Sequence, residues 1–439
     1  MQFPDTIFAL STGRPPSGVA VVRVSGKASR RALETIAGGA PSPRRAELTT
    51  LRNAAGEVID RGLAIFFPGP ASFTGEDCAE FHLHGGRAVV EALSAALLAI
   101  DGMRPAEAGE FTRRAFLNGK MDLVEAEALA DLVNAETEAQ RRFAVVSAGG
   151  AQSTLYEGWR KRIVHARAMI EAELDFADES DVPGSVADAV WIDVAALADE
   201  IDRHVAGFHR AEILREGFSV VIVGAPNAGK SSLLNALARR EVAIVTDEPG
   251  TTRDLVQVAL DLDGVKVVIT DTAGIREGAG KVEAIGIARA LASAGQADLV
   301  VQLEDLSVPR ARVAIPDGSA ELIKVGSKLD LAGGGSGHDV ALRLSVQDGR
   351  GIADLLELIS AKAGLAAGNI QDLAPARARH VMFLKEAAAC LRRALAAGAG
   401  LELRAEELRR AGEAFGKIAG TVDVEEVLGV IFSEFCIGK

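Results

Sequence analysis

The sequence has few cysteines and no long apolar run. Only three of its 439 residues are cysteine, namely Cys78, Cys390 and Cys436, and they lie far apart. They form neither a metal-ligand spacing nor an even-numbered disulfide framework, which favours a reducing compartment. No segment reaches the roughly 18 uninterrupted apolar residues of a membrane span, and the N-terminus, MQFPDTIFAL, lacks the order of a signal peptide. We therefore expect a cytoplasmic protein without a membrane span.

An excess of basic residues is also missing. The chain has 48 Lys and Arg against 61 Asp and Glu, a formal net charge of -13. This balance argues against binding nucleic acid through global charge, because that attraction comes from Lys and Arg neutralising phosphates. A local basic face stays possible, although each candidate pair is more often a solvated helix face. The candidates are Arg113-Arg114, Arg141-Arg142, Arg160-Lys161-Arg162 and Arg409-Arg410.

What is present is an ordinary globular composition, 48% hydrophobic and 25% charged. At roughly 100–200 residues per domain, the length predicts two to four domains. Residues 1–119 mix strand-like runs with short helices, as in an α+β domain. Residues 120–212 and 371–439 carry apolar residues at helical spacing, which predicts one discontinuous helical domain; two independent bundles are the alternative. Between them, residues 213–370 alternate strands and helices like a parallel α/β domain.

A phosphate-binding loop opens this α/β segment. Residues 224–231 read GAPNAGKS, after a strand-like run and before a helical one. The backbone N–H groups of such a loop wrap phosphate, Lys230 reaches the outer phosphates, and the Ser231 hydroxyl binds magnesium. The predicted nucleotide contacts of the loop are Asn227, Ala228, Gly229, Lys230, Ser231 and Ser232.

Two further motifs follow in the order that a GTPase requires. The strand-like residues 265–270 end in Asp271, Thr272, Ala273 and Gly274, which puts a carboxylate beside the magnesium and a glycine N–H near the γ-phosphate. Before them, a threonine at 251 or 252 can complete the magnesium shell only while the γ-phosphate is present, which makes a switch. The whole segment is assigned to nucleotide contact: Thr246, Asp247, Glu248, Pro249, Gly250, Thr251 and Thr252.

The choice of base falls to residues 327–330, which read SKLD. Asp330 can accept hydrogen bonds from the N1 and N2 donors of guanine, which adenine cannot supply, and Lys328 would cover the face of the base. Small-GTPase-like proteins usually have Asn where Ser327 stands. The last base loop is assigned to Ser345, Val346 and Gln347. These residues predict guanine rather than adenine.

The residue after Gly274 is Ile275, not the glutamine that orients the attacking water in many GTPases. Hydrolysis then needs another source of positive charge. Asn227 together with the loop 246–251 could hold a monovalent cation against the phosphates, where it would act as an arginine finger does. The alternative, an Asn that caps a turn, stays open at this point.

Further motifs lie outside the nucleotide segment. The chain ends in FCIGK, and the N-terminal part contains Asp5-Thr6-Ile7, VRVSG at 22–26, Glu80, HGG at 84–86, GEFT at 109–112 and KMDL at 120–123. With the inserted P-loop domain, they make the whole chain resemble the tRNA modification GTPase family MnmE (TrmE). The resemblance implies a 5-formyltetrahydrofolate site, or one for a related one-carbon folate, at Arg23, Glu80, Lys120 and Lys439.

The same resemblance implies the ions and the chemistry. Potassium would lie on Asn227 and on the backbone of Thr246, Glu248 and Thr251, and magnesium on Ser231 and Thr252; Pro249 departs from the more usual small residue. Glu283 would orient water, which makes Glu283, Lys230 and Asp271 the predicted catalytic residues. A homodimer, joined by an MnmG-like flavoprotein in a heterotetramer or larger complex, would add an aminomethyl or carboxymethylaminomethyl group to C5 of wobble uridine in tRNA.

Some alternatives stay open. Cys436 could act as a nucleophile near folate and uridine, but a packed or merely accessible thiol is the simpler interpretation. The P-loop domain alone would also fit a regulatory GTPase that acts as a timer in ribosome assembly. A third interpretation is a folate-dependent transferase with an accessory GTPase. A folate pocket at Arg23, Glu80 and Lys120 would favour one-carbon chemistry over the timer.

Overall fold

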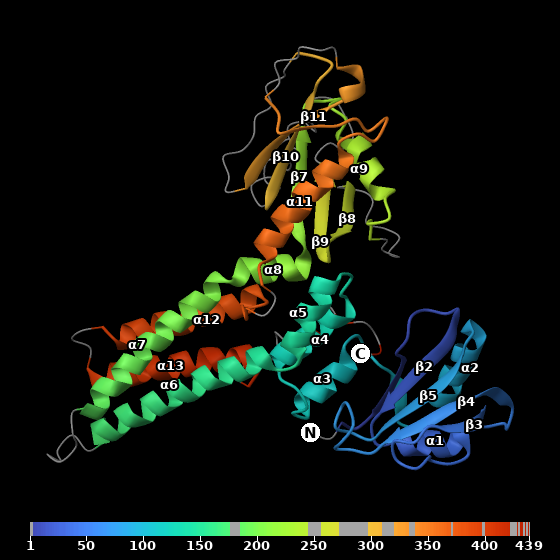
Figure 1. Ribbon diagram of the computed structural model, residues 1–439. Coiled ribbons are helices and arrows are strands. Elements are labelled where there is room, and N and C mark those ends of the chain that lie inside the picture. Colours follow the sequence, from blue (N-terminus) through green and yellow to red (C-terminus); the bar gives the residue numbers. More distant parts are fainter. Residues whose placement is uncertain are drawn as a thin grey trace, which may run out of the picture. The chain divides into compact units, whose positions relative to one another are not determined.

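The computed structural model describes residues 3–175, 185–244, 256–271, 297–309, 320–332, 339–369, 372–396, 400–421, 428, 431, 432, 435 and 438. Within these residues there are two six-stranded sheets and a set of long helices (Figure 1). The chain forms two compact units, one of residues 1–130, 153–160 and 412–439, the other of residues 131–152 and 161–411. None of the described helices is both long and apolar enough to cross a membrane.

The first sheet lies in the first unit, in the order β3-β4-β5-β2-β1-β6. Its neighbours pair antiparallel, except that β1 and β6 are parallel. In the register of β2 with β5, Arg23 lies directly opposite Glu80. The strands are β1 (Thr6–Leu10), β2 (Ser17–Ser25), β3 (Glu47–Arg52), β4 (Val58–Phe67), β5 (Cys78–Gly85) and β6 (Met103–Pro105).

The two faces of this sheet differ because side chains alternate along a strand. On one face, Val22 and Val24 are buried with residues of α1 (Ser29–Ala37) and α2 (Arg87–Leu98) in one hydrophobic core. Arg23, between these valines, belongs to the other face. There α3 (Glu110–Leu117) contributes Phe111 to a small apolar cluster with Ile7 and Ala9 of β1 and with Ala106 and Phe73.

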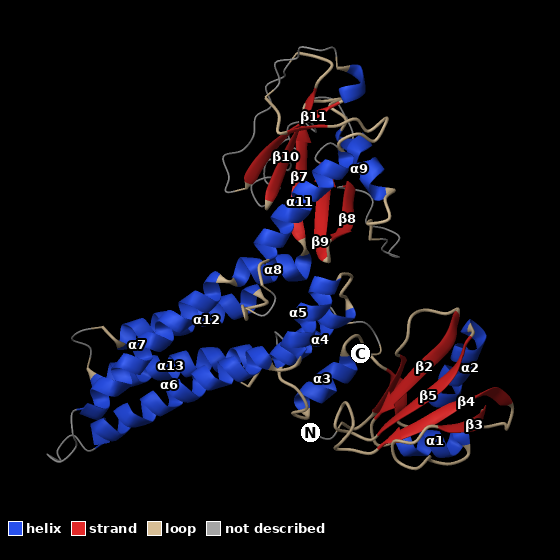
Figure 2. Ribbon diagram, viewed as in Figure 1, coloured by secondary structure: helices blue, strands red, loops and turns tan. Residues whose placement is uncertain are grey.

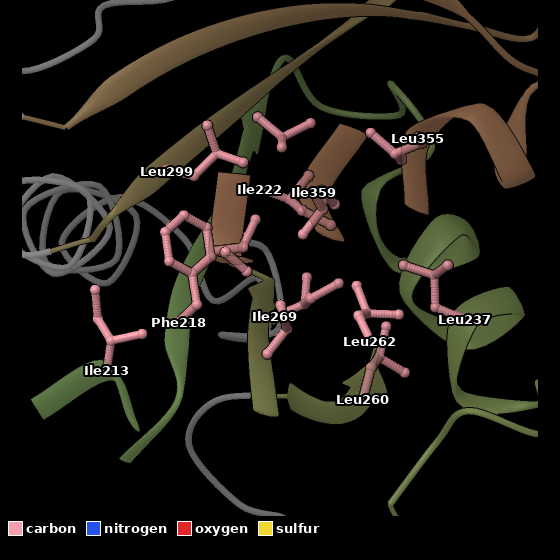
Figure 3. Close-up of a cluster of buried hydrophobic side chains, with 14 of the residues drawn as sticks. Ile213, Phe218, Ile222, Leu237, Leu260, Leu262, Ile269, Leu299, Leu355 and Ile359 are labelled. Carbon is pink, nitrogen blue, oxygen red and sulfur yellow. The ribbon is translucent and has the colours of Figure 1, made fainter. Parts of the chain in front are cut away.

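The second sheet lies in the second unit, in the order β12-β11-β10-β7-β9-β8, and is parallel apart from the β8–β9 hairpin (Figure 2). Its strands are β7 (Phe218–Gly224), β8 (Val256–Leu262), β9 (Val265–Asp271), β10 (Leu299–Asp305), β11 (Glu321–Ser327) and β12 (Leu342–Arg343). The helices α9 (Lys230–Ala238) and α11 (Ile352–Ala367) share one core with it. Figure 3 shows Phe218 and Ile222 of β7 beside Ile269 of β9 and Ile359 of α11 in that core.

Two helices that precede β7 in the chain also enter this core. They are α5 (Glu138–Ala148), through Ala139 and Phe143, and α8 (Phe208–Glu216), through residues such as Ile213. A capping box of Thr137 and Gln140 begins α5, and the Ala139 N–H donates to the Gly264 carbonyl in the β8–β9 turn at 3.0 Å. Lys266 of β9 is paired with Glu136. The helix α5 is therefore held at the start of β9.

The remaining helices are α4 (Leu123–Val133), α6 (Ala151–Asp175), α7 (Ser185–Ala206), α12 (Ala378–Ala394) and α13 (Leu401–Ala419). Tyr156 and Trp159 of α6 lie against Phe415 of α13, with ring centroids 6.3 and 6.0 Å away. The helices α7 and α12 also pack together. The predicted fold class, in which two helical segments separated by an α/β domain join each other, is confirmed; the domain boundaries stay predictions.

Candidate functional site

The loop between β7 and α9 has the backbone that a phosphate site needs. Asn227 and Gly229 have φ of 61° and 94°, so the chain turns through left-handed conformations just before α9 begins. At Gly224, an added Cβ would lie 2.6 Å from the Leu303 carbonyl oxygen of β10, which explains the glycine at the end of β7. The first N–H groups of α9 have no partner within the helix and carry the positive end of its dipole. Such a loop can hold an anion.

Lys230 is held inside this loop and is only 7% exposed. Its ammonium donates to the carbonyls of Gly224 at 2.9 Å and of Ala225 at 3.0 Å. Burial lowers the pKa of Lys230, and the attraction of Asp271 opposes that shift. A buried ammonium held only by carbonyls gains from a nearby negative charge, and the phosphates of a nucleotide would supply it.

Ser231 and Asp271 meet at the end of β9. The Ser231 hydroxyl donates to a carboxylate oxygen of Asp271 at 2.6 Å, and Asp271 is fully buried. The two motifs are 40 residues apart in sequence, and their contact places a hydroxyl and a carboxylate together at the phosphate loop. Hard oxygen ligands of this kind fit magnesium, which takes one or two protein ligands besides phosphates and water.

The two segments that were assigned to the base, 327–330 and 345–347, are joined by a hydrogen bond. The Ser345 hydroxyl donates to the Asp330 carboxylate at 2.7 Å, and Ser345 is buried. Val346 is half-buried and Gln347 is exposed. The Lys328 ammonium lies 2.6 Å from Asp305. Although burial acts in the opposite direction, hydrogen bonds from Lys328 and Ser307 keep the pKa of Asp305 below its usual value.

Ser327 connects this base loop to the phosphate loop, a contact that the motifs alone do not reveal. Its side chain is buried at the end of β11. The hydroxyl lies 2.7 Å from the Ala228 carbonyl oxygen and 3.2 Å from that of Glu304. Ser327, which stands where asparagine is usual, therefore makes a hydrogen bond to the phosphate loop.

Several predicted residues lie outside the described part of the chain, so their roles stay predictions. They are Thr246, Asp247, Glu248, Pro249, Gly250, Thr251, Thr252, Thr272, Ala273, Gly274, Glu283, Cys436 and Lys439. The described part of the nucleotide site therefore consists of the phosphate loop, Asp271 and the base loops.

A second polar cluster lies on the first sheet. The Arg23 guanidinium donates to Glu80 at 3.0 Å, and the other oxygen of Glu80 lies 3.1 Å from the His82 ring. The guanidinium carbon of Arg23 also lies 5.4 Å from the ring centroid of Phe73 and 6.0 Å from that of Phe111. His82 was not predicted as part of this cluster, although its position two residues after Glu80 on β5 places both on one face.

Lys120 lies against the loop that carries Phe73. Its ammonium donates to the Pro70 carbonyl at 2.9 Å. The chain end is described only in part, yet the Ser11 hydroxyl, just after β1, donates to the Gly438 carbonyl at 2.9 Å. The residue before Lys439 is thereby attached to the first sheet.

Most arginines of the proposed basic pairs have acidic partners. Arg114 is 1% exposed and bonds to Asp5, Glu76 and Glu110, so it is not available to an external phosphate. On the helices, the other pairs follow the same pattern: Arg141 and Arg142 with Glu138, Arg162 with Asp193 and Glu200, and Arg409 with Glu406. The described arginine pairs thus have the character of compensated helix faces.

The sheet order, the phosphate loop and the Ser231–Asp271 contact define a P-loop nucleotide-binding protein of the Ras-like α/β type. The family model described as "MnmE helical domain" matches residues 123–436, and the one described as "GTP-binding protein TrmE N-terminus" matches residues 6–120. The chain belongs to the tRNA modification GTPase MnmE family.

Two curated relatives agree with this assignment. A tRNA modification GTPase MnmE of Mesorhizobium japonicum is 62% identical, with 99% of each chain covered. One of Brucella melitensis is 56% identical, covering 100% of this chain and 99% of its own. Among solved structures, the G domain of T. maritima FeoB covers 34% of this chain and 99% of its own at 22% identity, with a TM-score of 0.25.

Proposed function

We propose that this chain hydrolyses GTP within a complex that modifies wobble uridine in tRNA. The observation that carries the nucleotide part is the convergence of three motifs: Lys230 and Ser231 in the loop, Asp271 on Ser231, and Asp330 held by Ser345. Asp330 would accept from guanine N1 and N2, which selects GTP. The relatives named above are tRNA modification GTPases, and that activity is proposed here for this chain.

For hydrolysis, the residues of the chain would hold and orient the triphosphate. Lys230 would leave its two carbonyl partners for the outer phosphates, and the first turn of α9 would donate to them. Magnesium, when bound, supplies charge neutralisation between the phosphates; Ser231 and Thr252 would hold it. Potassium would be held by Asn227, Thr246, Glu248 and Thr251, and Glu283 would orient the attacking water. The left-handed Asn227 at the tip of the loop is compatible with such a role.

We further propose that the first sheet binds 5-formyltetrahydrofolate or a related one-carbon folate. The contact between Arg23 and Glu80, beside two aromatic rings, offers charged groups with flat apolar surfaces, which suits a ring system that bears amide and carboxylate groups. Lys120 on the adjacent loop and Lys439 after the attached Gly438 would add positive charge. A homodimer and an MnmG-like flavoprotein partner complete the proposal, with an aminomethyl or carboxymethylaminomethyl group as the product at C5.

GTP turnover tests the nucleotide part. We expect hydrolysis in potassium, much less in sodium, and loss of turnover in Lys230→Ala, since no other described group can replace its charge at the loop. Ser94→Ala is a suitable control, because this serine lies on α2 of the first sheet and bonds only within its helix. Equal rates of GTP hydrolysis in sodium and potassium would contradict the proposed role of potassium. Full activity of Lys230→Ala would contradict the assignment of the nucleotide site.

Folate binding tests the other part independently. Glu80→Ala should weaken the affinity for 5-formyltetrahydrofolate roughly tenfold or more, because it removes a charged acceptor and leaves Arg23 without its carboxylate. GTP turnover in the absence of tRNA should not change. An unaltered folate affinity would show that the first sheet does not use this cluster.

A further inference from the structure

We infer that Ser327 supplies no hydrogen-bond donor to the N7 atom of a bound guanine base, so that 7-deazaguanine nucleotides bind as tightly as guanine nucleotides. The inference rests on the proposed function, because it requires a guanine nucleotide in this site. It concerns the way in which the base is recognised, which the motifs by themselves do not determine.

Ser327 is buried, with only 2% of its surface exposed. A serine hydroxyl carries one hydrogen and two lone pairs. Among the residues that the structure describes, its hydrogen-bond partners are the carbonyl oxygens of Ala228 at 2.7 Å and Glu304 at 3.2 Å, and both can only accept. The single hydrogen is therefore used within the protein. Only lone pairs are left for any group that approaches from the base.

Ser327 lies between the loop predicted to bind the base and the loop predicted to bind the phosphates. It is the last residue of β11, directly before the loop that carries Asp330, and it bonds to Ala228 of the phosphate loop. A nucleotide with its phosphates on one loop and its N1 and N2 groups on Asp330 would extend between the two loops that Ser327 connects. Guanine N7 is an acceptor. Two acceptors do not attract each other, so Ser327 cannot read N7.

An asparagine at this position would behave differently. Its amide has two hydrogens, one for the Ala228 carbonyl and one for the base. Ser327 therefore keeps the bond between the loops and lacks the second donor. The remaining reader of the base is Asp330, held by Ser345 at 2.7 Å. Recognition by the N1 and N2 edge still separates guanine from adenine.

Calorimetric titration of the full-length protein with GDP and with 7-deaza-GDP tests this inference. For the wild type, we expect dissociation constants that agree within about twofold. Ser327→Asn should bind GDP roughly three- to tenfold more tightly than 7-deaza-GDP, the usual value of one hydrogen bond. Ser327→Thr, which keeps the hydroxyl, should behave like the wild type. Ser94→Ala, which removes a hydroxyl-to-carbonyl bond within the helix α2, is the matched control.

The titrations distinguish failure of this inference from failure of the proposed function. A wild-type preference for GDP of threefold or more over 7-deaza-GDP would overturn the inference and leave the GTPase proposal intact. Failure to bind either nucleotide would instead reject the proposed function. Should Ser327→Asn fail to fold in this buried position, the wild-type ratio alone still decides. Ser327→Ala should weaken both nucleotides equally, because it breaks the bond between the loops and not a contact with the base; an unequal loss would also contradict the inference.

Discussion

The helix α5 provides the sharpest test of how the nucleotide domain is built. Phe143 of this helix is 5% exposed and packs in the core of the second sheet, although it precedes β7 by 75 residues, from 143 to 218. Because Phe143 belongs to this core, its truncation must destabilise the same folding unit that binds the nucleotide. We therefore consider Phe143→Ala.

The magnitude follows from burial. Full burial of a phenylalanine side chain contributes about 1.5–3 kcal/mol by transfer from water. The cavity left by truncation adds to this loss, and Phe→Ala changes in cores cost roughly 3–5 kcal/mol. Because Phe143 keeps a few per cent exposure at the edge of the core, we expect about 3 kcal/mol. At about 2–4 °C per kcal/mol for a unit of this size, the midpoint should fall by roughly 6–12 °C.

Thermal unfolding with and without GDP is the assay. A protein of several domains does not unfold in two states, so the transition that contains the nucleotide site must be identified first. GDP raises the midpoint of that transition because it binds only the folded site. Val145→Ala, on the same helix at 45% exposure, is the control and should change stability by less than about 0.5 kcal/mol. A GDP-sensitive transition that Phe143→Ala leaves unchanged would refute this account of the core.

Three further predictions concern buried polar groups. Arg114→Met should cost about 3–5 kcal/mol in urea unfolding, because it removes the buried guanidinium shared by Asp5, Glu76 and Glu110, of which Asp5 and Glu110 keep only Arg104 as an ion-pair partner among the described residues. Burial raises the pKa of Asp5 and Glu110, but hydrogen bonds from arginines outweigh it and lower both pKa values. Their contribution to stability is thus complete above about pH 5 and is lost as the pH falls through the lowered pKa values, so the urea midpoint should drop from pH 5 to pH 3. Ser345→Ala should weaken GDP binding roughly fivefold in calorimetry, since Asp330 loses its donor.

These three predictions fail in different ways. A cost below about 1 kcal/mol for Arg114→Met would mean that the carboxylates find other partners. A urea midpoint that stays constant between pH 5 and pH 3 would show that the arginine contacts do not favour the charged carboxylates. Unchanged GDP affinity in Ser345→Ala would show that Asp330 needs no support to read the base.

The sequence was most informative where function depends on local backbone. The phosphate loop could be predicted because its glycines, lysine and serine occupy fixed positions between one strand and one helix. The contact of Ser231 with Asp271 could be expected from motif order, since both follow strands of one parallel sheet. Asp330 and Ser345 were assigned to the same base from two separate base-recognition motifs, and they are bonded to each other.

Other features depend on contacts between distant residues, which no local pattern encodes. The apolar side of α5 is visible as a periodicity, but the periodicity does not say that Phe143 packs on the second sheet. Arg114 resembled half of a basic surface pair because its partners Asp5 and Glu76 are 109 and 38 residues away. The role of Ser327 in joining two loops likewise required the position of Ala228.

The central claim is that this chain uses GTP to modify wobble uridine in tRNA. The most direct test is mass spectrometry of the wobble nucleoside in tRNA from cells that lack the gene, with either the wild type or Lys230→Ala returned on a plasmid. We predict an unmodified C5 in the deletion strain, restoration by the wild type and no restoration by Lys230→Ala. A normally modified C5 in the deletion strain would contradict the proposed function.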